Sequence, residues 1–446
     1  MSKKSFVFND TETTGLNTWF SQIIQIGSVL TDEDFNVEEE LNLSSKVLPW
    51  VVPTKGAYET HKQTNNLEDG MSHYDMMHFL KNKWLSWGKT KELVHVTYNG
   101  MKFDEELFRR HFYWNLIDPY LTKNANGSSR IDLMIIIFLV ANFYSDKIKI
   151  PTDDDGNLRY KLEMVAEANG ISSLNAHDAV VDSYLMINLV RLITKEIPEL
   201  WESAIRTSKK KDLIASLNEQ PFSMLAEIFK GKPFSYPVFP VAQNSKKTNE
   251  VLLVDLYFDP KDLFEMSYSE LKGQIGRSGA FKKIAINKTQ PIINVNLIKN
   301  AESFLDESIE VLAARAKSIK ENEEFKQKLS QILEDDDKTW AEKNIVEQKI
   351  YYGFSSPADK LWMERFEIST WDEKVKLVDG FEDERYRELA QRIICYEKPE
   401  FATEEMLENY HNLVKSRLFT KGPWNSPGET LDQAIHKVEL ALGEEK

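Results

Sequence analysis

Apolar and polar positions alternate along the first 200 residues in a way that predicts strands interspersed with helices. Period-two alternation predicts β-strands over 5–9, 25–31, 40–48 and 94–99. Apolar residues at helical spacing predict helices over 75–87, 104–112, 132–143, 160–168 and 178–194. This order is typical of an α/β fold in which a meander of strands is followed by helical crossovers.

The pattern changes after Trp201, where a lysine run at 209–211 and a proline-spaced stretch indicate a domain boundary. The spaced prolines are Pro221, Pro233, Pro237 and Pro240. Beyond this stretch, short strand-like segments predict a small β-rich domain with helices around it, at 251–258, 282–287 and 292–295.

The last third of the chain is helical in pattern from residue 301 onward. A final helical block runs from 355 to the C-terminus and is interrupted by Pro399 and Pro423. We therefore expect three domains, at 1–200, 201–352 and 353–446.

Composition agrees with several packed domains, because 446 residues exceed one ordinary hydrophobic core and 41% of them are hydrophobic. The single Cys395 cannot form an internal disulfide, which indicates a reducing compartment and a core position for this thiol. The longest apolar run, 133–144, is shorter than the ~20 residues that span a bilayer. We expect a cytoplasmic monomer without a targeting segment or membrane contact.

The formal net charge of −15 argues against a protein that coats nucleic acid through bulk attraction. It leaves open a cleft with local positive charge. Acidic runs such as Glu38-Glu39-Glu40 and Asp153-Asp154-Asp155 are expected to be solvated loops or faces.

Four acids from three separated segments are candidates for a metal site. Asp10 and Glu12 stand two apart at a strand end, so both face the same side if the strand stays extended. Asp104 follows the strand at 94–99 and opens a helix, and Asp182 lies on the last long helix of the first domain. Two divalent cations about 3.5–4 Å apart suit phosphodiester hydrolysis, and hard cations prefer carboxylate ligands. Without a cation these acids would raise one another's pKa values.

His177 precedes Asp182 by five residues, a spacing that separates two side chains by about 140° on a regular helix. Both can face one site only if His177 lies in the loop or first turn before the helix. An imidazole there could take a proton from an attacking water near neutral pH. Each residue alone also fits a structural role, as a turn acid or a helix N-terminal charge, and only the combination favours catalysis.

Three motifs together resemble those of the DEDDh 3′–5′ exonuclease superfamily. They are Asp10-Thr-Glu-Thr-Thr-Gly-Leu16, Asn99-x-x-x-Phe103-Asp104 and His177-x-x-x-x-Asp182. Further segments are similar to the bacterial exodeoxyribonuclease I family, within 98–120, 167–171, 175–179 and 350–355. The similarity is dense over the first 200 residues and sparse beyond them.

The resemblance implies an α/β RNase H-like exonuclease domain, a small β-rich SH3-like barrel domain and an all-α C-terminal domain, which together form a C-shaped clamp. It implies processive 3′–5′ degradation of single-stranded DNA to 5′-mononucleotides, in DNA repair and recombination. Two Mg²⁺ ions, for which Mn²⁺ could substitute, would be held by Asp10, Glu12, Asp104 and Asp182, with His177 as the general base. Substrate contacts would come from Glu12, Lys161, Arg109, Tyr120 and Arg130.

The residue at Lys161 departs from the family pattern, in which an arginine is expected. The positive charge is kept, but the bidentate contact that an arginine makes with phosphate is lost. Single-strand binding also uses aromatic stacking, for which Phe112, Tyr113, Trp114 and Tyr120 are candidates, although several of these must be core.

Two other functions remain open. An RNA-trimming exoribonuclease shares the motifs, but such enzymes usually end shortly after the last one, whereas over half of this chain follows Asp182. A non-catalytic nucleic-acid-binding protein would be indicated by loss of one acid or of the histidine, and all five residues are present. The resemblance also suggests binding of the C-terminal tail of single-stranded DNA-binding protein, for which the sequence reveals no pocket.

Overall fold

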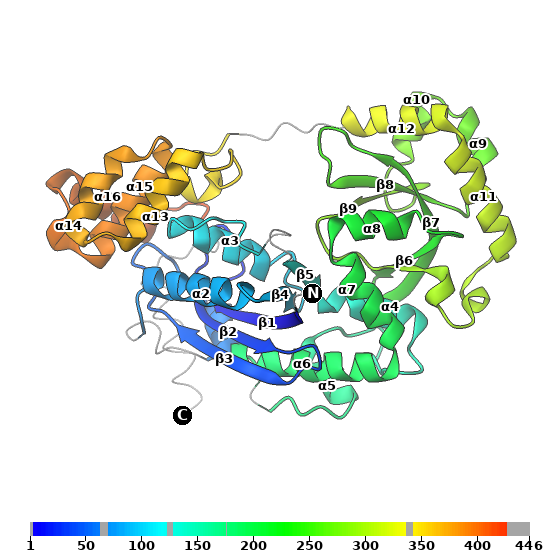
Figure 1. The fold of residues 1–446 in the computed structure, drawn as a ribbon, viewed down its shortest axis with the longest axis horizontal. Helices are drawn as coiled ribbons and strands as arrows, with labels where there is room; N and C mark the ends of the chain where they lie inside the picture. The colour runs from blue at the N-terminus through cyan, green and yellow to red at the C-terminus, as the bar shows by residue number, and fades with distance from the viewer. Residues whose placement is uncertain (1–2, 63–69, 123–127, 175, 336–341, 426–446) are drawn as a thin grey trace.

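The computed structural model describes residues 3–62, 70–122, 128–174, 176–335 and 342–425. Residue 175, from one of the similar segments, and 426–446, from the predicted C-terminal domain, lie outside the described residues. Figure 1 shows the first sheet in the middle, a second sheet on one side of it and a group of helices on the other.

The first sheet has five strands in the order β3-β2-β1-β4-β5. Its antiparallel part consists of β1 (Lys3–Thr13), β2 (Ile23–Thr31) and β3 (Val37–Ser44). Its parallel part adds β4 (Lys91–Thr97) and β5 (Ser129–Asp132), each aligned with the strand before it in the sheet. The sequence predicted strands over 5–9, 25–31, 40–48 and 94–99. Strand β1 is longer than predicted. Strand β5 was not predicted, because a strand of four residues shows no clear periodicity.

Helices cover both faces of this sheet, which explains why its central strands are apolar on both sides. Val7 packs in a core with α2 (His73–Gly88) and α3 (Asp104–Trp114). Phe6 and Phe8 pack in the opposite core, and the helices of that core are α4 (Leu133–Phe143), α5 (Leu162–Ala168), α6 (Ala179–Glu196) and α7 (Pro198–Thr207). A short helix, α1 (Lys55–His61), was not expected.

The second sheet is antiparallel, in the order β10-β6-β7-β8-β9. We call residues 208–335 the second-sheet region. Its strands are β6 (Ser223–Phe229), β7 (Lys232–Gln243), β8 (Glu250–Asp255), β9 (Phe281–Ala285) and β10 (Ile292–Asn294). Its helices are α8 (Lys210–Leu217), α9 (Pro260–Glu265), α10 (Tyr268–Gly273), α11 (Ile309–Glu321) and α12 (Glu323–Glu334), with 3-10 turns η2 (Val295–Leu297) and η3 (Ala301–Phe304).

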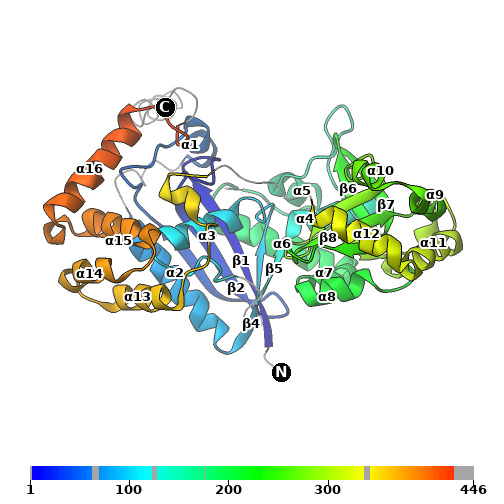
Figure 2. The same cartoon turned by 90° about the horizontal axis from the view of Figure 1, so that it is seen from above.

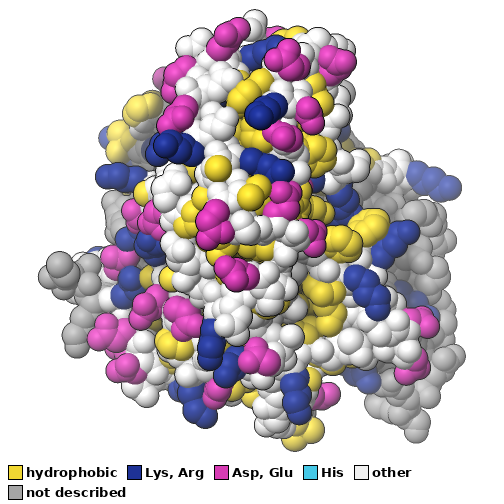
Figure 3. Space-filling model, turned by 90° about the vertical axis from the view of Figure 1, so that its right-hand side faces the viewer, with side chains coloured by type: hydrophobic (Ala, Val, Ile, Leu, Met, Phe, Trp, Pro, Cys, Tyr) yellow, Lys and Arg dark blue, Asp and Glu magenta, His cyan; other side chains and the backbone are white. Residues whose placement is uncertain are grey.

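Most of the proline-spaced stretch forms a strand of the second sheet, which was not expected. Pro233, Pro237 and Pro240 all lie within β7, and the strand accommodates them with a register shift between Pro240 and Ala242. The second sheet also shares the hydrophobic core of α4, since Phe222, Met224 and Phe239 belong to it. On its outer side, the second-sheet region carries acidic and basic side chains interspersed (Figure 3).

The last described part of the chain, 342–425, contains a group of helices that pack beside α2 and α3 (Figure 2). They are η4 (Val346–Lys349), α13 (Pro357–Ile368), α14 (Trp371–Leu377), η5 (Val378–Gly380), α15 (Glu384–Glu397), η6 (Pro399–Phe401) and α16 (Glu404–Phe419). The predicted interruption at Pro399 is confirmed, and Cys395 is buried as expected.

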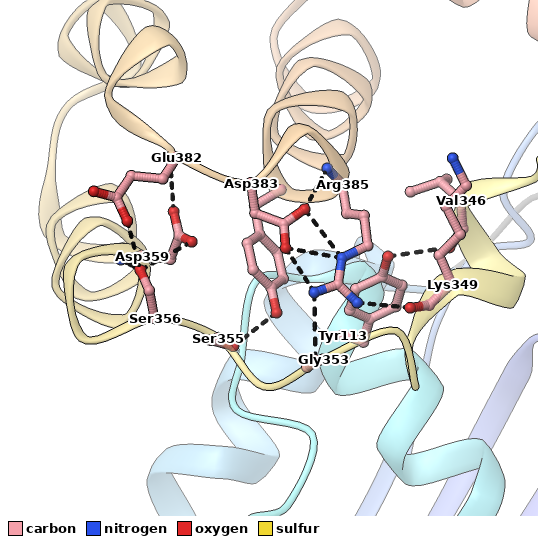
Figure 4. A network of polar contacts seen from close by, with 11 residues as sticks. Tyr113, Val346, Lys349, Gly353, Ser355, Ser356, Asp359, Glu382, Asp383 and Arg385 are labelled. Atoms are coloured by element: carbon pink, nitrogen blue, oxygen red, sulfur yellow. Dashed lines mark hydrogen bonds and ion pairs between the residues drawn. The ribbon is translucent and has the colours of Figure 1, made fainter.

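Arg385 fixes the segment that leads into these helices (Figure 4). Its guanidinium donates to the carbonyl oxygens of Lys349 at 2.6 Å and Gly353 at 3.3 Å, and it pairs with Asp383. Tyr113 of α3 donates to the carbonyl of Val346 at 3.0 Å, so the segment is tied to the first sheet's layer as well. Among the described residues, no helix has the length and apolarity to cross a membrane.

Candidate active site

Asp10 and Glu12 lie on β1, beyond the point where this strand stops pairing with β4. Pairing of β1 with β4 ends at Phe8 and Val96, whereas pairing with β2 continues through Asp10 and Glu12. The carboxylates therefore lie at the carboxyl end of the parallel strands, where a sheet leaves room for a ligand. Because side chains alternate along a strand, Asp10 and Glu12 face the same side, that of Phe6 and Phe8.

The first turn of α6 brings Asp182 to this edge. Asp178 caps the helix by accepting hydrogen bonds from the backbone N–H groups of Val180 at 3.0 Å and Val181 at 3.4 Å. Gly27, the partner of Asp10 on β2, allows the close approach, since a Cβ there would lie 2.1 Å from the carbonyl oxygen of Ala179. Sequence reasoning missed Gly27, because nothing local distinguishes it from other strand glycines.

Three acids come together as a result. One carboxylate oxygen from each of Asp10, Glu12 and Asp182 lies within 4.8 Å of the others. Asp104 is not in this group: it is the first residue of α3, is 5% exposed, and accepts a 2.6 Å hydrogen bond from Thr11 Oγ1. Its charge still acts on Asp10 and Glu12, whose pKa values it raises.

Burial and mutual repulsion raise the pKa values of these four carboxylates, Asp10, Glu12, Asp104 and Asp182. Burial, followed by the charges of Asp182, Asp104 and Asp178, raises the pKa of Glu12 to about 8. Burial raises the pKa of Asp104 to about 7, and it raises that of Asp182 to about 6 against the opposing effect of His177. The pKa of Asp10 is raised well above its ordinary value, first by burial and then by Asp104. Such a donor set fits a hard divalent cation, whose charge would remove the repulsion.

His177 lies in the turn before α6, where the five-residue spacing placed it. Its backbone has a positive φ of 72°, and its N–H donates to Asp182 Oδ2 at 3.3 Å. The strained turn and the cap at Asp178 together direct the histidine toward the same groove that Asp182 lines.

The groove has a volume of about 990 Å³ and opens onto the acids. Asp10, His177 and Asp182 line it together with Lys161, whose side chain is 72% exposed and lies 3.7 Å from the carboxylate of Glu163. Sequence reasoning missed other lining residues, namely Leu16, Tyr98, Arg159 and Tyr160. The basic–aromatic sequence just before α5 is the pattern that could have revealed Arg159 and Tyr160.

The other predicted contact residues do not line this groove. Arg109 pairs with Glu106 at 3.5 Å and lies over the ring of Tyr120, 5.7 Å from its centre. Arg130 is buried in an ion pair of 2.9 Å with Glu105. Substrate contact by these three residues stays a prediction. Stacking by the other aromatic candidates is wrong, because these side chains are core, with exposed fractions of 1% for Phe112, 1% for Tyr113 and 6% for Trp114.

The first region is similar to known proteins. Residues 7–190 match the family model described as Exonuclease. The chain is similar to Exodeoxyribonuclease I of Escherichia coli (strain K12), at 26% identity over 384 residues that cover 81% of this chain and 78% of that protein. It is also similar to Exodeoxyribonuclease I of Haemophilus influenzae, at 26% identity over 86% of this chain and 84% of that protein.

Solved structures share the fold of nearly the whole chain. E. coli Exonuclease I in complex with a dA16 oligonucleotide superposes with a TM-score of 0.82, at 22% identity, over 99% of this chain and 96% of that one. A structure of SSB/Exonuclease I in complex with an inhibitor superposes with a TM-score of 0.79, at 22% identity, over 99% of both chains. At 22% identity, this similarity shows that the fold is shared. Because it covers 99% of the chain, the shared fold includes the second-sheet region and the C-terminal helices.

Proposed function

We propose that the protein is a 3′–5′ exonuclease that degrades single-stranded DNA to 5′-mononucleotides. The match of residues 7–190 to the Exonuclease family model and the similarity to Exodeoxyribonuclease I support this proposal. The observation that carries the proposal is the meeting of Asp10, Glu12 and Asp182 within 4.8 Å of one another, beside an open groove that Asp10 and Asp182 line. Similarity to the exodeoxyribonucleases over most of both chains supports DNA as the substrate.

Asp10, Glu12, Asp104 and Asp182 would hold two Mg²⁺ ions, for which Mn²⁺ could substitute. Their raised pKa values support this assignment, because buried carboxylates that repel one another favour a cation as partner. Bound there, divalent cations would supply charge against the phosphodiester oxygens and favour ionisation of the attacking water.

His177 would act as the general base. Its imidazole lines the groove beside Asp182, so a ring nitrogen can accept the proton that the attacking water loses. Asp182 would stabilise the imidazolium that forms, since opposite charges attract more strongly in a partly buried groove than in bulk water.

Lys161 and Arg159 would contact the phosphates of the strand, and Tyr98 and Tyr160 offer apolar surface to its bases. We further propose that 1–200 is the exonuclease domain, that 201–352 is an SH3-like barrel domain and that 353–446 is a helical domain. The barrel domain and the helical domain lie on opposite sides of the first sheet (Figure 1), and together they would form a clamp around the DNA strand. We also propose a role in DNA repair and recombination, and binding of the C-terminal tail of single-stranded DNA-binding protein. The fold shared with the structure of SSB/Exonuclease I supports the second of these proposals.

The test compares 3′-labelled and 5′-labelled single-stranded DNA and RNA of equal sequence, each with Mg²⁺ and with EDTA. Metal-dependent release of the 3′ label from DNA is the expected result. Preference for RNA would assign the protein to the RNA-trimming exoribonucleases instead. Binding of DNA without release of either label would make it a non-catalytic binding protein.

A further inference from the structure

A tight turn between β4 and α3 carries Asp104. Asn99 has a positive φ of 58°, and a Cβ on Gly100 would lie 2.2 Å from Thr97 Oγ1, so the backbone folds closely over the strand end. The carbonyl oxygen of Gly100 accepts hydrogen bonds from the N–H groups of Phe103 at 3.1 Å and Glu105 at 2.9 Å. The position of Asp104 therefore follows that of the turn at 99–101.

Asp132 holds this turn with both of its carboxylate oxygens. Oδ1 accepts from the N–H of Asn99 at 2.8 Å, and Oδ2 accepts from the N–H of Met101 at 3.1 Å. The residue is 2% exposed and also caps α4 through the N–H of Met134 at 3.2 Å. Charge-assisted bonds from a buried carboxylate are strong and directional, so the turn is fixed relative to the end of β5.

The second-sheet region contacts Asp132 and the turn at 99–101 through its own turn at 287–289, between β9 and β10. Thr289 Oγ1 accepts a 2.9 Å hydrogen bond from the backbone N–H of Asp132. Lys288 Nζ donates to the carbonyl oxygen of Met101 at 3.4 Å. The turn therefore touches both the residue that holds the Asp104 turn and the turn itself.

A second connection reaches the residue that follows Asp104. Arg130 Nη2 donates to the carbonyl oxygen of Asn287 at 3.1 Å, and Arg130 Nη1 pairs with Glu105 Oε2 at 2.9 Å. Glu105 is 3% exposed, so this ion pair is buried and its geometry is constrained by packing. The turn at 287–289 is thus joined to the chain on both sides of Asp104, through the carbonyl oxygen of Met101 and the side chain of Glu105.

We propose that the 287–289 turn of the second-sheet region is a positioning element of the acidic site: through Asp132 and Arg130 it sets where Asp104 stands relative to Asp10. This inference rests on the proposed function, because it assumes that Asp104 helps to hold a cation. Residues that orient metal ligands from outside the ligand set affect metal affinity and catalysis, typically by 10–100-fold. The second-sheet region therefore contributes to the site itself, besides any contact that it makes with DNA.

The test uses Thr289→Val, which removes the acceptor for the Asp132 N–H at almost unchanged volume, and Thr289→Ser, which keeps the hydroxyl. Ser208→Ala is the matched control, because Ser208 Oγ donates to Ser129 Oγ at 2.8 Å, at the other end of β5. Mn²⁺ binding is measured on the DNA-free protein by calorimetry, and kcat and KM are measured on 3′-labelled single-stranded DNA.

We expect Thr289→Val to weaken Mn²⁺ binding about tenfold and to lower kcat by a similar factor, with KM for DNA within about twofold of the original. Thr289→Ser and Ser208→Ala should behave like the unaltered protein. Asp132→Asn, which keeps one acceptor but presents an amide N–H to Met101, should weaken Mn²⁺ binding as well.

Unchanged Mn²⁺ binding in Thr289→Val would overturn the inference, and so would equal weakening in Ser208→Ala, which would indicate a general effect of the contact between regions. Because Mn²⁺ binding is measured without DNA, failure of this inference can be distinguished from failure of the proposed nuclease function. If the unaltered protein binds Mn²⁺ but does not cleave DNA, the nuclease proposal fails while the positioning effect is still measured. If it binds no divalent cation, both fail.

Discussion

Thr11 Oγ1 donates a hydrogen bond of 2.6 Å to Asp104 Oδ1. Thr11 stands between Asp10 and Glu12 on β1, and side chains alternate along a strand, so it points to the opposite face of the sheet from both acids. Asp182 approaches on the face of the two acids, from α6. This hydrogen bond explains why Asp104 comes to the site from the other face and is not in the group of three acids within 4.8 Å.

Loss of this hydrogen bond should change the pH dependence of activity. Donation to the ionised carboxylate lowers the pKa of Asp104, against burial, which raises it to about 7. Thr11→Val should therefore raise that pKa and move the acid limb of the kcat–pH profile upward by about one unit, since a hydrogen bond to a charged group contributes about 1.5 kcal/mol. Thr11→Ser should keep the original profile. An acid limb that is identical in the valine variant would show that Asp104 does not titrate with activity.

The cation-free protein should lose stability as the pH rises. The pKa of Glu12 is raised to about 8 and that of Asp104 to about 7. A carboxylate whose pKa is higher in the folded chain contributes stability that is fully present below its unfolded pKa of about 4 and is lost as the pH passes the folded value. We expect the melting temperature in EDTA to fall between about pH 5 and pH 8, and to fall less in Glu12→Gln.

Mg²⁺ should restore this stability, and more at pH 8 than at pH 5. Protons compete with the cation for the same carboxylates, so binding strengthens as they ionise. A cation at a hundred times its dissociation constant stabilises by about 2.7 kcal/mol, which calorimetric melting curves resolve. A Mg²⁺ effect of equal size at both pH values would contradict a site built from these acids.

Gly27→Ala should impair both folding and activity. The added Cβ would lie 2.1 Å from the carbonyl oxygen of Ala179, so the start of α6 must move away from β2 and take Asp182 with it. Overpacking of this kind costs about 1–3 kcal/mol, measured by urea unfolding, and kcat should fall with it. Gly273→Ala is the control, because a Cβ at Gly273 meets nothing within 4 Å. Equal effects of the two substitutions would refute the close-approach role.

Lys161 should influence substrate binding more than chemistry. Its side chain is 72% exposed at the groove wall, so Lys161→Ala should raise KM for single-stranded DNA several-fold and leave kcat nearly unchanged. Removing one phosphate contact should also reduce the slope of log KM against log salt concentration by about 0.7. Lys161→Arg should lower KM through bidentate contact. Lys195→Ala, at an exposed lysine near the end of α6, is the control, and a KM change of the same size there would remove the role from Lys161.

The sequence predicted the features that depend on local periodicity. Alternation along β1 places Asp10 and Glu12 on one side, and the helical angle between His177 and Asp182 places the histidine before the helix, as the structure has it. The order of strands and helices in the first region follows from the same periodicities, because its cores are regular and apolar.

Features that depend on contacts distant in sequence could not be predicted. The approach of α6 to Gly27 and the buried pair of Arg130 with Glu105 join residues far apart in the chain, and no local pattern encodes them. Strand β7 was missed because its spaced prolines were interpreted as a domain boundary, and proline is uncommon inside a strand. Arg130 was expected to contact DNA because it lies near the acids, and its ion pair with Glu105 is seen only in the structure.

Whether the acidic cluster catalyses the reaction is tested by 3′-label release from single-stranded DNA by the Asp182→Asn variant. The control is Asp262→Asn, which makes the same change in the first turn of α9. We expect Asp182→Asn to lower kcat on the order of a hundredfold to a thousandfold while the protein stays folded, and Asp262→Asn to leave kcat unchanged. Wild-type release by a folded Asp182→Asn variant would contradict the assignment of the acidic cluster as the catalytic site.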